Sequence, residues 1–186
     1  MKEENRSAAG FGAIGLAAAF IFSVIWVVAA SADPSWIVGN DYISKLGVSD
    51  VKLTADLFNY GCNLVGILMF VYGIGKAYAY RGGECASGLL VTIAGALLFL
   101  IGIIHSGNDY HVLISVLLFV FLALAILAAG ATNAKEGKML NAAVCACVLV
   151  AAAISFAGIS PEMGEAVMVA GSMAWIIADS LKLIFD

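Results

Sequence analysis

Charged residues are scarce in this chain of 186 residues, where Asp, Glu, Lys and Arg together make up only 12%. A soluble domain usually has about a quarter of its residues charged, whereas 63% of this chain is hydrophobic. So few polar groups cannot cover a surface in water, which excludes an ordinary soluble fold. The nine Lys and Arg residues form no basic patch, so we expect no nucleic-acid partner.

Six long apolar runs are present instead. They cover residues 9–31, 55–76, 86–104, 112–131, 140–158 and 164–184. Each is close to the roughly 20 residues that a helix needs to cross a bilayer core, and the alternation of a membrane β-barrel is absent. The first run is longer than the usual core of a cleaved signal peptide, so we expect it to be a span; cleavage after Ala30-Ser31-Ala32 is the alternative. The sequence therefore predicts a single all-α domain over residues 1–186, an integral membrane six-helix bundle.

The basic residues alternate from loop to loop. Seven of them lie near the chain ends or the second and fourth connections: Lys2, Arg6, Lys76, Arg81, Lys135, Lys138 and Lys182. The remaining loops hold only Lys45 and Lys52. Because cytoplasmic loops attract Lys and Arg, we expect a multi-pass protein of the cell membrane with cytoplasmic N- and C-termini. The long connection 32–54 is then on the outer side, and its apolar residues predict that it folds back onto the bundle.

Polar side chains gather at the expected outer end, where three loops converge. The candidate ligand-binding residues are Asp41, Ser44, Asp56, Asn59, His105, Asp109, His111, Glu162 and Glu165. A polar pocket and a set of helix-end residues that face water both fit this pattern. A metal site from His105, Asp109 and His111 with a glutamate of the next loop is a third alternative. Since no zinc-type spacing is present and neither histidine lies in mid-span, we assign no metal, no haem and no other cofactor.

Polar residues inside the expected spans are few. Asn59 and Asn63 lie one turn apart, and a buried amide usually bonds a neighbouring helix. The alternative is that Asn59 and Asp56 form the floor of an outer cavity. Asp179 has Lys182 three residues further on, which predicts a local ion pair. A proton relay is the alternative role for Asp179, because an acid inside a membrane is costly. The four cysteines are expected to pack as small apolar residues.

Small residues repeat every four positions in the last span, at Ala166, Ala170, Ala174 and Ala178. Such a face lets two helices approach closely. Packing within the bundle is the first expectation, and a homo-oligomer contact through such faces is the alternative.

Three short stretches carry a resemblance to a known family. Tyr42-Ile43-Ser44-Lys45-Leu46-Gly47 follows the first span, Phe58-Asn59 opens the second, and Gly102 precedes the His111 that opens the fourth. On these residues the chain resembles the domain-of-unknown-function 998 family, small multi-span membrane proteins of prokaryotes.

The resemblance implies which positions matter at the outer end. Ser44, Asn59 and His111 match the family pattern, and they would line one pocket. Lys45 stands where the family usually has an acid, and Ile104-His105 replaces its Phe-Pro step. The resemblance therefore supports no role that depends on that acid.

Two functions of different classes are consistent with these patterns. The first is non-enzymatic binding of a membrane lipid or small polar ligand at the outer end. The second is a small intramembrane hydrolase or transferase acting on a lipid headgroup, with His111 or His105 as base and Ser44 as nucleophile. Because no recognised catalytic motif is present, binding is the preferred prediction.

Overall fold

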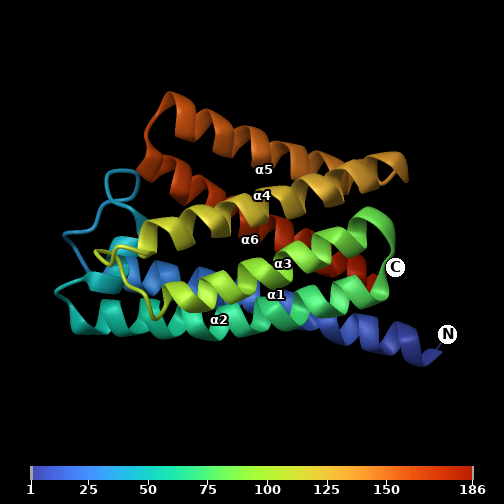
Figure 1. Cartoon of the computed structure of the whole chain (residues 1–186), viewed down its shortest axis with the longest axis horizontal. Coiled ribbons are helices and arrows are strands. Elements are labelled where there is room, and N and C mark those ends of the chain that lie inside the picture. Colours follow the sequence, from blue (N-terminus) through green and yellow to red (C-terminus); the bar gives the residue numbers. More distant parts are fainter. Residues whose placement is uncertain (1, 186) are drawn as a thin grey trace.

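The computed structural model describes residues 2–185 and contains six long helices (Figure 1). They are α1 Lys2–Ala32, α2 Lys52–Ala79, α3 Gly82–Ile101, α4 His111–Lys135, α5 Met139–Gly158 and α6 Pro161–Phe185. Each contains a segment long and apolar enough to cross a membrane. The prediction of an all-α, six-helix membrane bundle is confirmed, and the chain is a multi-pass membrane protein.

The helices form a closed ring in which chain neighbours pack side by side and α6 packs back onto α1. The turns at 80–81 and 136–138 and both ends of the described chain lie at one end of the bundle, here named the termini end (Figure 1). The loop 33–51 and the turns at 102–110 and 159–160 lie at the other end, here named the long-loop end. α5 packs mainly on α4 and α6 and is the most peripheral helix.

Glycines set the closest helix contact, which joins α2 and α3. Gly66 and Gly73 in α2, and Gly88 and Gly95 in α3, recur at seven-residue intervals. A Cβ atom at Gly66 would lie 2.5 Å from the backbone nitrogen of Phe99. The two backbones therefore touch, which is how small residues stabilise helix pairs in a membrane.

The alanine repeat of the last span has a different position. Ala166 is buried, whereas Ala170 and Ala174 are exposed on the outer surface of α6. Only part of the repeat is thus used for packing within the bundle. A homo-oligomer contact through the exposed part stays a prediction.

The long loop packs against the helices, as its apolar residues predict. Its 3₁₀ helix η1, Ile43–Val48, buries Ile43 and Leu46. The Asn59 side chain on α2 donates a hydrogen bond of 2.8 Å to the Gly47 carbonyl. These contacts hold η1 against the bundle beside the start of α6, because Glu165 also bonds the backbone of Ile43.

Asp33 ties together the two ends of the same loop. Its carboxylate accepts a hydrogen bond of 2.6 Å from the Ser35 hydroxyl and one of 2.5 Å from the Ser49 hydroxyl. These hydrogen bonds favour the charged form and hold the pKa of Asp33 below its usual range.

Candidate functional site

A cavity of about 390 Å³ opens at the long-loop end, between α4, the end of α5, the start of α6 and the long loop. This volume lies within the range of small-molecule sites, about 300–1,000 Å³. Its apolar walls include Val112, Val116, Phe119 and Phe156. Its polar lining groups include Ser44, His111, Ser115 and Glu165. The cavity therefore has an apolar body with a polar end.

The apolar wall continues onto the surface of the bundle. Val112 and Val116 are 68% and 54% exposed on α4, a helix that is apolar enough to cross a membrane. In a bilayer this surface faces lipid rather than water. The cavity thus borders the membrane on its side.

The orientation of the His111 ring follows from its two nitrogen contacts. Nδ1 lies 2.7 Å from the Ile104 carbonyl oxygen, which can only accept, so Nδ1 carries a hydrogen and donates it. Nε2 lies 3.3 Å from the Ser115 hydroxyl oxygen. In the neutral ring Nε2 is then a hydrogen-bond acceptor, and this acceptor belongs to the cavity lining.

Glu165 is the buried acid of this site, only 7% exposed. Its Oε2 atom accepts a hydrogen bond of 3.0 Å from the backbone N–H of Ile43, and the N–H of Ser44 interacts with the same carboxylate. These are the first N–H groups of η1, which receive no side-chain cap from Tyr42. The carboxylate of α6 therefore caps η1 from another element.

A second void of about 30 Å³ lies deeper in the bundle and shares Ser44, Ser115, Phe119 and Glu165 with the cavity. A water molecule needs about 10–15 Å³ of such space, so the void has room for one or two. Glu165 thus lies between a large cavity at the surface and a small void in the core.

The structure brings three of the nine predicted site residues together at this cavity, namely Ser44, His111 and Glu165. Asn59 bonds the Gly47 carbonyl instead and, with Asp56, does not line it. The floor is therefore not built from Asp56 and Asn59.

The other predicted residues have separate partners. Asp41 pairs with Lys45 at 2.9 Å, and this contact holds the pKa of Asp41 below its usual range. Asp56 pairs with Lys52 at 2.5 Å. The His105 ring bonds the Gly102 carbonyl at 3.2 Å.

Asp109 is exposed on its turn, and Glu162 lies against the Tyr42 hydroxyl. Burial, with the charge of Glu162, raises the pKa of Tyr42. Among the described residues no three His, Cys, Asp or Glu side chains are grouped as a metal ion would require, so the four-ligand alternative is not assembled.

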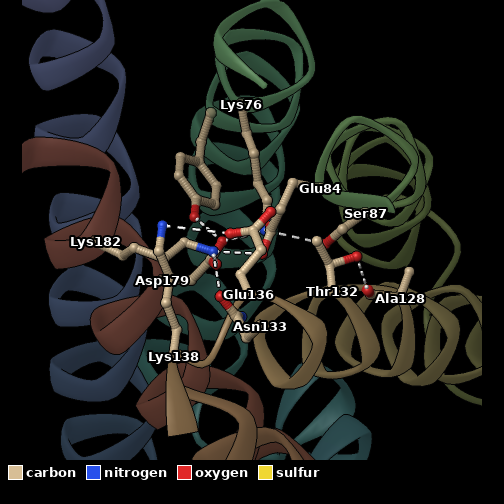
Figure 2. A network of polar contacts seen from close by, with 11 residues as sticks. Lys76, Glu84, Ser87, Ala128, Thr132, Asn133, Glu136, Lys138, Asp179 and Lys182 are labelled. Atoms are coloured by element: carbon tan, nitrogen blue, oxygen red, sulfur yellow. Dashed lines mark hydrogen bonds and ion pairs between the residues drawn. The ribbon is translucent and has the colours of Figure 1, made fainter. Parts of the chain in front are cut away.

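A second polar centre lies inside the bundle at the termini end. Lys76 of α2, Glu84 of α3, and Asp179 and Lys182 of α6 point toward one another (Figure 2); these four residues are here named the buried charge ring. Lys76 pairs with Asp179 at 2.5 Å and with Glu84 at 2.9 Å. Lys182 pairs with Glu84 at 2.5 Å and with Asp179 at 3.3 Å. Opposite charges alternate around a closed, neutral ring.

Neutral side chains complete the ring. The Tyr72 hydroxyl donates to Asp179 at 2.6 Å, and Lys76 donates to the Ser87 hydroxyl at 3.0 Å. Asn133 of α4 accepts from Lys182 at 3.2 Å (Figure 2). The Lys76 ammonium also lies 5.2 Å from the centre of the Trp175 ring, within cation–π range.

Desolvation of four charges is expensive, and only a nearly complete set of partners offsets it. Lys76 is 0% exposed and each of the other three side chains is buried. The ring joins α2, α3 and α6 directly and α4 through Asn133. It therefore cross-links four helices at the termini end.

Sequence reasoning missed this ring. The predicted local pair of Asp179 with Lys182 exists, but the contact of Asp179 with Lys76 is shorter and spans 103 positions. Lys76 and Lys182 were assigned to cytoplasmic loops, whereas both are buried. The sequence does contain one sign of the ring. Its two lysines and two acids all fall at one expected depth in the membrane. When Lys76 and Lys182 are left out of the count, five basic residues remain in the loops and chain ends of the termini end, against two at the long-loop end.

Comparison with known proteins identifies a family but no relative of known activity. No curated protein and no solved structure matches the chain. A family model described as a protein of unknown function, DUF998, matches residues 16–180. Because that match spans all six helices and most of the length, as the short motifs at 42–47, 58–59 and 111 predict, the chain belongs to the DUF998 family.

Proposed function

We propose that this protein binds a membrane lipid, or a molecule of similar amphipathic form, in the cavity at the long-loop end. The observation that carries the proposal is the lining of the cavity, apolar along α4 and polar at Ser44, His111 and Glu165. An amphiphile matches this division, since its tail would lie along Val112 and Val116 and its head group at the polar end. The lateral border with the bilayer gives such a ligand direct access.

The remaining charge difference supports a location for this site. Without the two buried lysines, five basic residues belong to the termini end by their place in the sequence, against Lys45 and Lys52 at the other end. By the attraction of cytoplasmic loops for Lys and Arg, the long-loop end is outside the cytoplasm. The cavity would then take its ligand from the outer leaflet of the cell membrane.

Photolabelling tests the binding function. The full chain in lipid nanodiscs is irradiated with a lipid analogue that carries a diazirine in its tail, and adducts are mapped. We expect saturable labelling of the cavity wall at 112–119 and Phe156. Val116→Trp fills the cavity and should reduce this labelling at least fivefold, whereas Val120→Trp, also on the exposed surface of α4 but outside the cavity lining, should not. Labelling that is spread evenly along α4 and unchanged by Val116→Trp would overturn the proposal.

One contact supports a second candidate, an intramembrane acyl hydrolase. His111 Nε2 faces the Ser115 hydroxyl at 3.3 Å, and the Ile104 carbonyl fixes the ring, which is the arrangement of an activated nucleophile. Ser115 would transfer its proton to His111 and attack an ester carbonyl. The departing alcohol would take that proton, leaving an acyl-serine for water to hydrolyse. Covalent labelling by a fluorophosphonate, lost in Ser115→Ala and kept in Ser44→Ala, would establish this function; no labelling would exclude it.

A further inference from the structure

Glu165 differs from the other buried acids of the membrane-spanning helices. Glu84 and Asp179 each pair with two lysines in the buried charge ring. Glu165 forms no ion pair within residues 8–185, and its protein partners in that range are the backbone N–H groups of Ile43 and Ser44. An acid inside a membrane is expensive and normally paired. Its missing counter-charge is therefore the unusual feature of this site.

The carboxylate retains hydrogen-bonding capacity on the cavity side. Two carboxylate oxygens offer about four acceptor positions, and two N–H donors occupy only part of them. Glu165 lines both the cavity and the deeper void. The one acceptor position of His111 Nε2 already faces the Ser115 hydroxyl at 3.3 Å, so Glu165 supplies the open acceptor positions of this lining. The polar end of the cavity therefore offers acceptors, and a matching ligand must bring donors.

Charge around the cavity has the same sign. Seven carboxylates occur at the long-loop end against two lysines; the acids are Asp33, Asp41, Asp50, Asp56, Asp109, Glu162 and Glu165. Lys45 and Lys52 are each bound to an acid four residues away, Asp41 and Asp56. The surrounding field is negative, which attracts cations and repels anions.

On the basis of the proposed function, we propose that the ligand is an amphiphile whose head group bears a primary ammonium that pairs with Glu165. The ammonium would supply the missing counter-charge and donate to the free acceptor positions of the carboxylate. A hydroxyl head group would satisfy hydrogen bonding without the charge. A phosphate or carboxylate head group would place a second anion beside Glu165.

Competition among amphiphiles with one common tail tests the head group. In phosphatidylcholine nanodiscs, dodecylamine, dodecanol and dodecyl phosphate compete with the photolabel described above, at concentrations corrected for membrane partitioning. We expect dodecylamine to displace the label at a concentration at least tenfold lower than dodecyl phosphate, with dodecanol in between. Dodecyltrimethylammonium, which has the charge but no N–H donor, should be weaker than dodecylamine.

Two matched variants test whether Glu165 causes the preference for the ammonium head group. In Glu165→Gln the side-chain oxygen can still accept from the Ile43 N–H, so the cap of η1 is kept while the charge is removed. We expect dodecylamine and dodecanol to displace the label within threefold of each other in this variant. Glu162→Gln removes a neighbouring acid that interacts with Tyr42 but does not line the cavity, and it should keep the preference. If Glu165→Gln does not fold, the competition among the four amphiphiles on the unaltered protein tests the head-group preference by itself.

The possible failures are distinct. Equal displacement by all head groups, or best displacement by dodecyl phosphate, would overturn the ammonium ligand and leave lipid binding intact. A preference that persists in Glu165→Gln would also overturn it. No displacement by any of these amphiphiles would contradict the binding function itself.

Discussion

At the scale of single residues, the two polar centres treat buried charge in opposite ways. In the buried charge ring each lysine lies between two carboxylates and each carboxylate between two lysines, at 2.5–3.3 Å. At the cavity, Glu165 has backbone donors but pairs with no cation among residues 8–185. The first arrangement cross-links the bundle, and the second is the basis of the proposed ammonium ligand. For this reason we assign a structural role to the ring and a binding role to the cavity.

The ring should show strong energetic coupling between its members. Lys76→Met leaves Asp179 with the 2.6 Å hydrogen bond from Tyr72 and the weaker 3.3 Å contact to Lys182, and the loss of one buried partner costs about 3–5 kcal/mol. Asp179→Leu should cost a similar amount. The double variant keeps the neutral Lys182–Glu84 pair at 2.5 Å, so its free energy of unfolding should fall by about 2 kcal/mol less than the sum of the single effects. Unfolding in detergent measures these values.

The exposed pair Lys52–Asp56 is a matched control, since it is also an ion pair of 2.5 Å but its side chains are 86% and 45% exposed. The same two replacements at this pair should change the free energy of unfolding by less than about 1 kcal/mol. Additive losses in the ring, or equal losses at both pairs, would show that burial does not control the coupling.

At the scale of elements, backbone contact between α2 and α3 determines how these two helices align. A Cβ atom at Gly66 or Gly95 would lie 2.5 Å from a backbone nitrogen of the opposite helix, at Phe99 or Phe70. Backbone atoms cannot rotate away, so the helices must separate. Gly66→Ala and Gly95→Ala should therefore each lower the free energy of unfolding by about 1–3 kcal/mol.

Gly10 in α1 provides the comparison, because a Cβ atom there would meet nothing within 4 Å. Gly10→Ala should leave stability unchanged or raise it by up to about 1 kcal/mol through helix propensity. Thermal unfolding of the three variants in one detergent gives the result. A loss at Gly10 equal to that at Gly66 would indicate a cause other than close helix approach.

The long loop should loosen in acid through Asp33. Hydrogen bonds from Ser35 and Ser49 lower the pKa of Asp33 in the folded protein, so their stabilisation is full above the unfolded value of about 3.9. It is lost as the pH falls through the lowered folded pKa. The fluorescence of Trp36 is obtained as the difference in tryptophan emission between the unaltered protein and Trp36→Phe. This emission should be constant at pH 5–7 and change below about pH 4.

Asp33→Ala should bring this emission change to neutral pH, because it removes the acceptor of both serine hydroxyls. Asp50→Ala, in the same loop, should leave the neutral-pH emission unchanged. A change centred above pH 5 would contradict the role of Asp33, since a lowered pKa cannot produce one there.

At the scale of the whole molecule, the sequence was sufficient for the membrane class, the six helices and the family. These depend on long apolar runs and short local motifs, which a single chain displays directly. Two of the four contacts in the buried charge ring join residues 98 and 103 positions apart, and periodicity within one span carries no information about them. Lys76 and Lys182 lie in the last turns of their helices, so counting charges by position assigned them to loops.

The same limit explains the partial prediction of the cavity. His111 and Ser44 are marked by the family motifs, and Glu165 by its place among the polar residues of the expected outer end. Phe119 and Phe156 are ordinary apolar residues in their spans, and only the arrangement of α4 against α5 makes them a cavity wall. Ser115 lies one turn after His111, but its contact with Nε2 depends on the ring orientation that the Ile104 carbonyl imposes.

Membrane orientation is a property of the whole molecule, and burial of two lysines changes the argument for it. Without these two, five basic residues at the termini end against two at the long-loop end still favour cytoplasmic termini. Cysteine labelling measures this in a variant whose four native cysteines are replaced by alanine. Asp109→Cys and Lys135→Cys then mark the two ends, since both positions are exposed.

In intact cells that express the protein, a membrane-impermeant maleimide should react with Asp109→Cys and not with Lys135→Cys. Permeabilised cells should react at both positions, which shows that the second thiol is accessible. The reverse pattern in intact cells would place the cavity and Glu165 at the cytoplasmic leaflet. The ammonium ligand would then have to come from the inner membrane surface, because Glu165 is about one turn from the start of α6 and is reached from that end of the bundle.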